Sequence, residues 1–237
     1  MRFGWLLLAL VVMALKPPDL FADDAANKIV EQIREGLVCR DSVELADVVI
    51  EGSDHATTLV LAQNATGKCP ETWVRFTSGE IDNKDSTSNG SQVGIQYFNR
   101  FCEGEYPDQK VWTPQRNRSR RYDVGPEEPI FGTAVTLLVP NPNLAGYLGL
   151  HREWEFVGQD RLKARSDALD PIALTFKKRE RGVTIERIEF GSSSKFEFEQ
   201  YKELHSGEYR PARIIAVVGK RKSVVRFLGR QYLDPGL

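Results

Sequence analysis

The sequence is poor in cysteine and histidine, which thiol chemistry and many metal sites require. It has three cysteines and three histidines in 237 residues and no C-x-x-C motif, so neither thiol–disulfide exchange nor a cysteine-based zinc site is indicated. The histidines, His55, His151 and His205, do not share a metal-ligand spacing. No G-x-S-x-G motif occurs, and residues 192–194 are serines with no histidine beside them. We therefore predict that the protein uses no metal or other cofactor, has no catalytic residues and is not an enzyme.

An excess of charge of one sign is also absent. The chain carries 32 basic and 33 acidic residues, a formal net charge of −1. Such a balance gives no global field that would attract nucleic acid or an anionic membrane. We expect no nucleic-acid partner and at most a peripheral contact with a membrane.

The apolar run at the N-terminus is too short to span a membrane. Residues 5–15 form an unbroken run of 11, against the ~20 that a spanning helix needs. A short positive head precedes the run and Lys16-Pro17-Pro18 ends it, which is the layout of a secretory signal peptide. We expect residues 1–22 to be removed and residues 23–237 to form one periplasmic or secreted domain. An uncleaved anchor is the alternative. Since no cysteine directly follows the run, the mature protein is not expected to be a lipoprotein itself.

The cysteines, Cys39, Cys69 and Cys102, leave two interpretations open. In an oxidising compartment two of them could pair and one would be left over. Buried thiols without a bridge are the alternative.

A long series of amphipathic strands is predicted from Trp154 to Phe227. Apolar residues alternate with polar or small ones, for example from Ile172 to Phe176, and this period of two gives each strand one apolar face and one polar face. Short turns containing Gly182 or Gly219 make neighbouring strands antiparallel. This half of the chain therefore predicts a large antiparallel meander.

The first half of the chain adds one amphipathic helix and more strands. The helix is expected from Asp23, taken as the N-cap, to Leu37, with Ile29 and Ile33 on its apolar stripe. Such a stripe must be buried against the sheet or across its open side. A helical turn is expected at 144–150, and strands are expected at 43–50, 57–63, 73–76 and 93–102. If the stretch from Lys110 to Tyr122 is also a strand, Arg116, Arg118 and Arg120 project from one of its faces.

Several short motifs resemble those of the outer-membrane lipoprotein-sorting family, the LolA-like periplasmic lipoprotein carriers. In the C-terminal half these are Ile172 to Phe176, Gly182, Arg187 and Phe190, followed by Tyr201, Leu204, Gly207, Pro211 and Ile214. Upstream they are Val111-Trp112-Thr113-Pro114, Arg120-Arg121 and Phe131-Gly132-Thr133. The resemblance covers residues 110–228 and implies an incompletely closed, half-open antiparallel β-barrel with the N-terminal helix as a lid.

In that family the concavity of the half-barrel shelters acyl chains from water, so the resemblance implies a lipid-binding site here. Each buried methylene contributes about 0.8 kcal/mol, so one chain supplies a large driving force. The expected lining is Trp154, Phe156, Leu174, Phe176, Phe196 and Phe198 from the strands, with Ile29 and Ile33 from the lid. The alternative is that these residues form an ordinary filled core.

A basic run forms a second candidate site. It consists of Arg116, Arg118, Arg120 and Arg121. Guanidinium groups bind phosphates and carboxylates in a bidentate manner, so this run could meet a lipid head group or an acidic partner. The alternative is a solvated strand face or an edge strand that the charges protect against aggregation.

These observations together favour an extracytoplasmic carrier of lipid or lipoprotein acyl chains, with transient envelope proteins as donor and acceptor. One rival is an envelope-stress sensor or protein-interaction module on the same fold. A secreted hydrolase is a further rival, which would require a cleft that gathers serine or aspartate with a histidine.

Overall fold

The computed structural model describes 14 stretches of the chain and covers most of the predicted mature protein. These are residues 19–37, 42–50, 56–64, 69–77, 95–100, 102, 105, 108–113, 118–122, 133–136, 141–151, 153–165, 171–203 and 209–232. Cys39, Arg116 and residues 1–18 of the expected signal peptide lie outside them.

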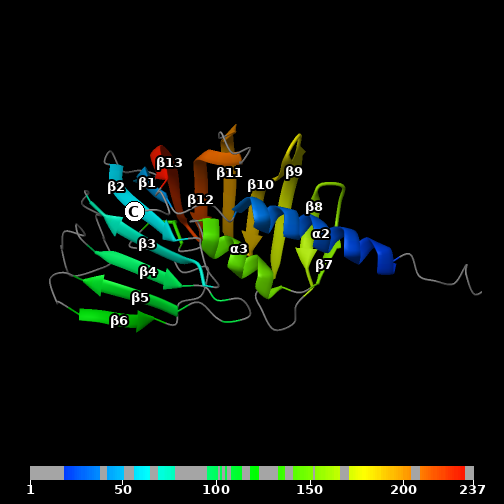
Figure 1. Ribbon diagram of the computed structural model, residues 1–237, viewed down its shortest axis with the longest axis horizontal. Helices are drawn as coiled ribbons and strands as arrows, with labels where there is room; N and C mark the ends of the chain where they lie inside the picture. Colours follow the sequence, from blue (N-terminus) through cyan, green and yellow to red (C-terminus); the bar gives the residue numbers. More distant parts are fainter. Residues whose placement is uncertain are drawn as a thin grey trace, which may run out of the picture.

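One antiparallel sheet of 13 strands makes up most of the described structure (Figure 1). Its strands are β1 Ser42–Ile50, β2 Ala56–Asn64, β3 Glu71–Phe76, β4 Gln96–Arg100, β5 Asp108–Thr113, β6 Arg118–Tyr122, β7 Trp154–Phe156, β8 Arg161–Ala164, β9 Ile172–Arg179, β10 Gly182–Phe190, β11 Ser194–Glu203, β12 Tyr209–Val218 and β13 Arg221–Tyr232. Their order in the sheet is β6-β5-β4-β3-β2-β1-β13-β12-β11-β10-β9-β8-β7. β6 and β7 are the two edges, so the sheet is curved but not closed, as in a half-open barrel.

The two halves of the sheet are joined by its first and last strands. β1 pairs with β13 from Ser42–Tyr232 to Ile50–Ser223, with a bulge between Leu45 and Ala46. The other strand pairs connect neighbours in the sequence. The fold is therefore two antiparallel meanders, β1–β6 and β7–β13, and one long-range pairing unites them.

Two helices cover the concave side of the sheet. α2 runs from Asp19 to Leu37 and contacts β7, β10 and the second helix, α3, which runs from Asn141 to Leu150 (Figure 1). The Arg34 guanidinium on α2 donates from Nε to the carbonyl of Ala145 on α3 at 3.0 Å. The helices therefore form one joined cover.

Both helices differ from their predicted extents. α2 begins at Asp19, so Asp23 lies inside the helix and the N-cap prediction was wrong. α3 is a helix of 10 residues where one turn was expected. Its first two residues are Asn141 and Pro142, types favoured at a helix N-cap and first helical position.

A continuous apolar core fills the space between helices and sheet. Ala26, Ile29, Val30 and Ile33 of α2 and Tyr147 and Leu148 of α3 are buried against inward-facing strand residues such as Phe76, Leu174, Phe190, Phe196 and Ile214. The outer face carries ion pairs between neighbouring strands, including Arg187–Glu197 at 3.0 Å and Arg213–Glu199 at 2.6 Å. The alternation predicted from the sequence is thus realised as an apolar concave face and a charged convex face.

The sequence left open whether two of the cysteines form a disulfide or remain thiols, and the structure contains one disulfide. Cys69 and Cys102 form a disulfide across 33 residues of sequence. It joins the chain just before β3 to the chain just after β4.

Candidate functional site

The sheet separates between β10 and β11 at one end. The two strands pair at four positions, from Phe190–Ser194 to Arg187–Glu197, whereas β11 pairs with β12 at nine positions and reaches Glu203–Tyr209. Two irregularities mark the separation. β10 bulges between Ile185 and Arg187, and Gln200 of β11 has a φ of 55° and drops out of the pairing with β12. A non-glycine residue in the left-handed region is uncommon and changes the strand direction.

Tyr201 lies in the gap that this separation creates. Its hydroxyl donates to the carbonyl of Ile185 across the gap, and Arg179 lies over its ring at 5.4 Å. Burial raises the pKa of Tyr201 above its usual value. The hydroxyl therefore stays a neutral donor and bridges β10 to β11 where the ladder no longer does.

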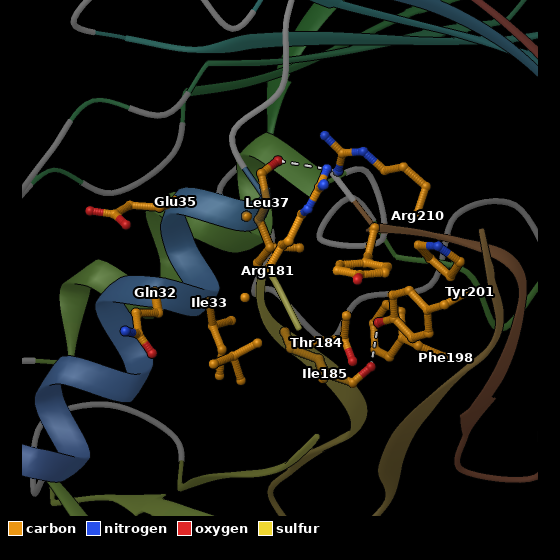
Figure 2. A pocket seen from close by; sticks show the side chains of 15 residues that line it. Gln32, Ile33, Glu35, Leu37, Arg181, Thr184, Ile185, Phe198, Tyr201 and Arg210 are labelled. Atoms are coloured by element: carbon orange, nitrogen blue, oxygen red, sulfur yellow. Dashed lines mark hydrogen bonds between the residues drawn. The ribbon is translucent and has the colours of Figure 1, made fainter. Parts of the chain in front are cut away.

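A cavity of about 410 Å³ occupies the space between this gap and the last turns of α2 (Figure 2). Its volume lies within the usual range of ligand pockets. The lining residues are Gln32, Ile33, Glu35, Gly36 and Leu37 of α2, Arg181 to Ile185 around the start of β10, Phe198 and Tyr201 of β11, and Tyr209, Arg210 and Pro211 of β12. Ile33, Ile185 and Phe198 also belong to the main core, so the cavity borders directly on the apolar interior.

The cavity wall also carries charge. Arg210 is only 5% exposed and donates from Nη1 to the carbonyl of Leu37 at 3.5 Å (Figure 2). The negative C-terminal end of the α2 dipole stabilises a positive charge at this position. Arg181 is exposed and lies 3.6 Å from Glu203, while Glu35 points away from both guanidinium groups. The lining therefore contains two guanidinium groups and one carboxylate.

Most residues of the predicted lipid-binding set lie in the core. Trp154, Leu174, Phe176, Phe196, Phe198, Ile29 and Ile33 are at most 8% exposed. Only Ile33 and Phe198 of the set line the cavity. Phe156 is 37% exposed at the end of edge strand β7, with its ring 6.4 Å from that of Phe176. The structure thus places one predicted residue at the rim of the core and two at an existing cavity.

The other half of the concavity is occupied by the chain itself. Residues 133–136 are buried against β1, β2, β3 and β13, and the Ala134 amide donates to Ser223 Oγ at 2.8 Å. The apolar space that remains there, lined by Leu61 and Phe76 among others, is about 20 Å³. That is room for about one water molecule.

The basic run lies on the far edge of the sheet. The backbone of Arg118, Arg120 and Arg121 belongs to edge strand β6, where Arg120 is opposite Val111 and Arg121 is opposite Lys110 of β5. Their side chains and Arg116 lie outside the described residues. The edge position is the one at which charges protect a sheet from further pairing.

Sequence reasoning missed Arg210, although the pattern contained a signal for it. Arg210 has the same parity as Ile214 and Ala216 of β12, and both of these face the core. A period of two therefore places an arginine on an apolar face, which is unusual without a buried partner or a function.

His151 lies at the junction of α3 and β7. It is 4% exposed, its ring lies against those of Tyr147 and Trp154, and neither ring nitrogen has a hydrogen-bond partner among the described residues. Burial lowers the pKa of His151 to about 4. The imidazole is therefore neutral at pH 7. No cluster of three or more potential metal ligands occurs in the described part of the chain.

Comparison with known proteins identifies the fold. No family model matches the sequence, and no curated protein matches it. Among solved structures, an outer membrane lipoprotein-sorting protein domain from Vibrio parahaemolyticus superposes with a TM-score of 0.65 at 13% identity, covering 89% of this chain and 96% of that one. A DUF1329 family protein from Desulfovibrio piger gives a TM-score of 0.63 at 13% identity, covering 91% and 95%.

The chain thus has the fold of the lipoprotein-sorting domain, and the predicted resemblance is confirmed at the level of fold. Among the helices that the structure describes, none has the length and apolar character to cross a membrane.

Proposed function

We propose that this protein is an extracytoplasmic carrier that shelters acyl chains of lipids or lipoproteins during envelope transport. The observation that carries the proposal is the cavity at the end of α2, which lies beside the β10–β11 gap and borders the apolar core at Ile33 and Phe198. A lidded concavity next to a break in the sheet is a geometry suited to a flexible apolar chain.

Loading requires movement of α2, because the core beneath the helix is packed. The apolar stripe of Ala26, Ile29, Val30 and Ile33 would separate from the strands, and the chain would take the place of these contacts. At about 0.8 kcal/mol per methylene, a chain of ordinary length offsets the exposure of several aliphatic side chains. The residues on which it would lie are Trp154, Leu174, Phe176, Phe196 and Phe198, with Phe156 at the rim.

The proposed location is the periplasm or the cell exterior. A disulfide between Cys69 and Cys102 suits an oxidising compartment, and the N-terminal sequence has the layout of a cleaved signal peptide. The partners would be envelope proteins that donate and accept the cargo, with peripheral contact to a membrane. No catalytic step is part of this function.

Native mass spectrometry tests the proposal. Residues 23–237 are exported to a bacterial periplasm, purified without detergent and examined for bound lipid. We expect a lipid adduct, and we expect Val183→Trp, which fills the cavity wall from a half-buried position, to reduce it strongly. Val157→Trp is the matched control, since Val157 is 50% exposed outside the cavity. A protein without adduct that also takes up no fluorescent fatty acid would contradict the carrier function.

A second candidate function is a protein-interaction module. The observation that favours it is the packing of the concave side, together with two exposed leucines on the adjoining strands β1 and β13, Leu45 at 40% and Leu228 at 56%. Leu45 is paired with Gly229, the residue next to Leu228, at the bulge in the β1–β13 pairing, so both exposed leucines belong to the same short stretch of the sheet. If no lipid binds, in-cell crosslinking from position 228 tests this function, and the absence of a specific crosslinked protein would contradict it.

A further inference from the structure

We propose that the cavity selects an anionic amphiphile, with its carboxylate or phosphate at Arg210 and Arg181 and its single chain directed toward Ile33 and Phe198. This inference rests on the proposed carrier function and adds the chemical class of the cargo. It also moves head-group recognition from the basic run on β6 to the opposite meander, at the gap between β10 and β11.

The two ends of the cavity differ in the chemistry that they offer. Toward the core it is bounded by Ile33, Ile185 and Phe198, each at most 6% exposed. Toward the β12 side it is bounded by the Arg210 guanidinium, which is buried, and by Arg181 at the mouth. An amphiphile whose charged and apolar ends are joined directly matches this arrangement.

The charge of the head group follows from the guanidinium groups. A guanidinium presents a planar fork of donors that fits carboxylate and phosphate oxygens, and such charge-assisted bonds strengthen away from bulk water. A cationic head group would be repelled by the two guanidinium groups, and a neutral one would form no ion pair with them. Free fatty acids and single-chain phosphate esters therefore fit better than chains held through a neutral ester or amide.

Among the described residues, the two guanidinium groups differ in the strength of their present contacts. The carbonyl of Leu37 already accepts a hydrogen bond from Arg210 Nη1, and Glu35 points away from the guanidinium groups in Figure 2. The contact of Arg181 with Glu203 is a 3.6 Å pair between side chains that are 69% and 46% exposed. Exposed pairs of this kind contribute little, so Arg181 can exchange Glu203 for a ligand oxygen.

The test compares two fluorescent probes that differ only in head-group charge, cis-parinaric acid and its methyl ester, at pH 8. We expect the wild-type protein to bind the acid at least tenfold more tightly than the ester. Arg210→Gln should lower the affinity for the acid about 10- to 100-fold, as expected for a lost hydrogen bond to a charged group. Arg181→Gln should lower this affinity severalfold. Neither change should alter the affinity for the ester, which also shows that the variant is folded.

Arg187→Gln is the matched control, because Arg187 lies on the outer face of β10 in an ion pair with Glu197 and lines no part of the cavity. It should change neither affinity. Equal binding of acid and ester, unchanged in both cavity variants, would overturn the anionic selection and leave the carrier function standing. Binding of neither probe would overturn both.

Competition experiments identify the source of the anion. Lysophosphatidic acid should displace cis-parinaric acid, and the zwitterionic lysophosphatidylcholine of the same chain length should do so more weakly. Inorganic phosphate at millimolar concentration should have no effect, because the chain provides most of the binding free energy. Displacement by inorganic phosphate alone would show a site for free anions and would contradict an amphiphile as the ligand.

Discussion

The buried imidazole of His151 and the half-buried phenol of Tyr201 each affect the stability of the fold through one side chain. His151 is neutral in the folded state because its surroundings are apolar and aromatic. Tyr201 joins β10 to β11 through one hydroxyl at the point where the strands part. Each gives a prediction at the scale of the residue.

His151 predicts that the protein loses stability as the pH falls from about 6.5 to about 4. The pKa of His151 is lowered from 6.5 to about 4 in the folded state, so the unfolded state binds the proton first and the free energy of unfolding decreases through this window. At 1.36 kcal/mol per pKa unit the full loss is about 3 kcal/mol. Urea unfolding at pH 7, 5.5 and 4.5 measures it. His151→Phe should have a flatter profile, and an unchanged slope would contradict the assignment.

Tyr201→Phe should lower the free energy of unfolding by about 1–2 kcal/mol, because the carbonyl of Ile185 loses its donor across the gap. Thermal unfolding of the purified variant gives this value. Tyr209→Phe, a change on the other side of the same cavity, is the comparison. A loss no greater than that of Tyr209→Phe would show that the bridge contributes nothing to stability.

At the scale of elements, the cover depends on how closely α2 and α3 approach each other. Gly149 of α3 allows the approach, because a Cβ at this position would lie 2.6 Å from Nη2 of Arg34. Arg34 in turn donates to the Ala145 carbonyl. The position of the Arg34 side chain therefore depends on a glycine at position 149. No local sequence pattern indicates this contact, because the two residues are more than 100 positions apart.

Gly149→Ala should be close to neutral, because Arg34 must move and the loss of its bond to Ala145, about 1 kcal/mol, offsets the gain of alanine over glycine in a helix. In an Arg34→Ala background the same change should stabilise by up to about 1 kcal/mol, the usual gain of alanine over glycine in a helix. A double-mutant cycle by chemical denaturation measures this coupling. Equal effects of Gly149→Ala in both backgrounds would contradict the contact.

The disulfide should stabilise the β3–β4 region. Replacing Cys69 and Cys102 together by alanine should cost about 2–4 kcal/mol, because the bridge closes a loop of 33 residues in the unfolded chain. Guanidinium unfolding of the oxidised protein and the double variant measures the difference. A double variant as stable as the oxidised protein would show that the bridge is not stabilising.

For the whole molecule, the sequence predicted the kind of sheet but not its break. Alternation from Ile172 to Phe176 and the apolar stripe of α2 depend on local periodicity, and the structure contains both as expected. The β1–β13 pairing is a contact across the whole chain, and no local pattern encodes it. The helix α3 was underestimated because its apolar residues are not confined to one stripe.

The candidate site was less predictable for a physical reason. Periodicity identifies which residues face inward, such as Leu174 and Phe196, but a filled core and a ligand-binding wall have the same pattern. The cavity exists because β10 and β11 stop pairing beyond Arg187, which depends on a bulge and on the backbone conformation of Gln200. The one feature of the site that the sequence indicated is that Arg210 has the same parity on β12 as the inward-facing Ile214 and Ala216.

The central claim is that α2 must move away from the sheet to admit an acyl chain. Gly36 of α2 lies beside β10, where a Cβ would be 3.8 Å from the Val183 carbonyl, so cysteines at these two positions are to be joined by a disulfide or, if the sulfurs do not meet, by a short reducible crosslinker. The variant carries Gly36→Cys and Val183→Cys, with Cys39→Ser to remove the third thiol. Uptake of cis-parinaric acid is measured with the link between positions 36 and 183 closed, and again after the link is reduced. Wild-type protein is treated in the same way as the control. We expect no uptake while the link is closed and full uptake after reduction. Equal uptake in both states would contradict a lid that opens.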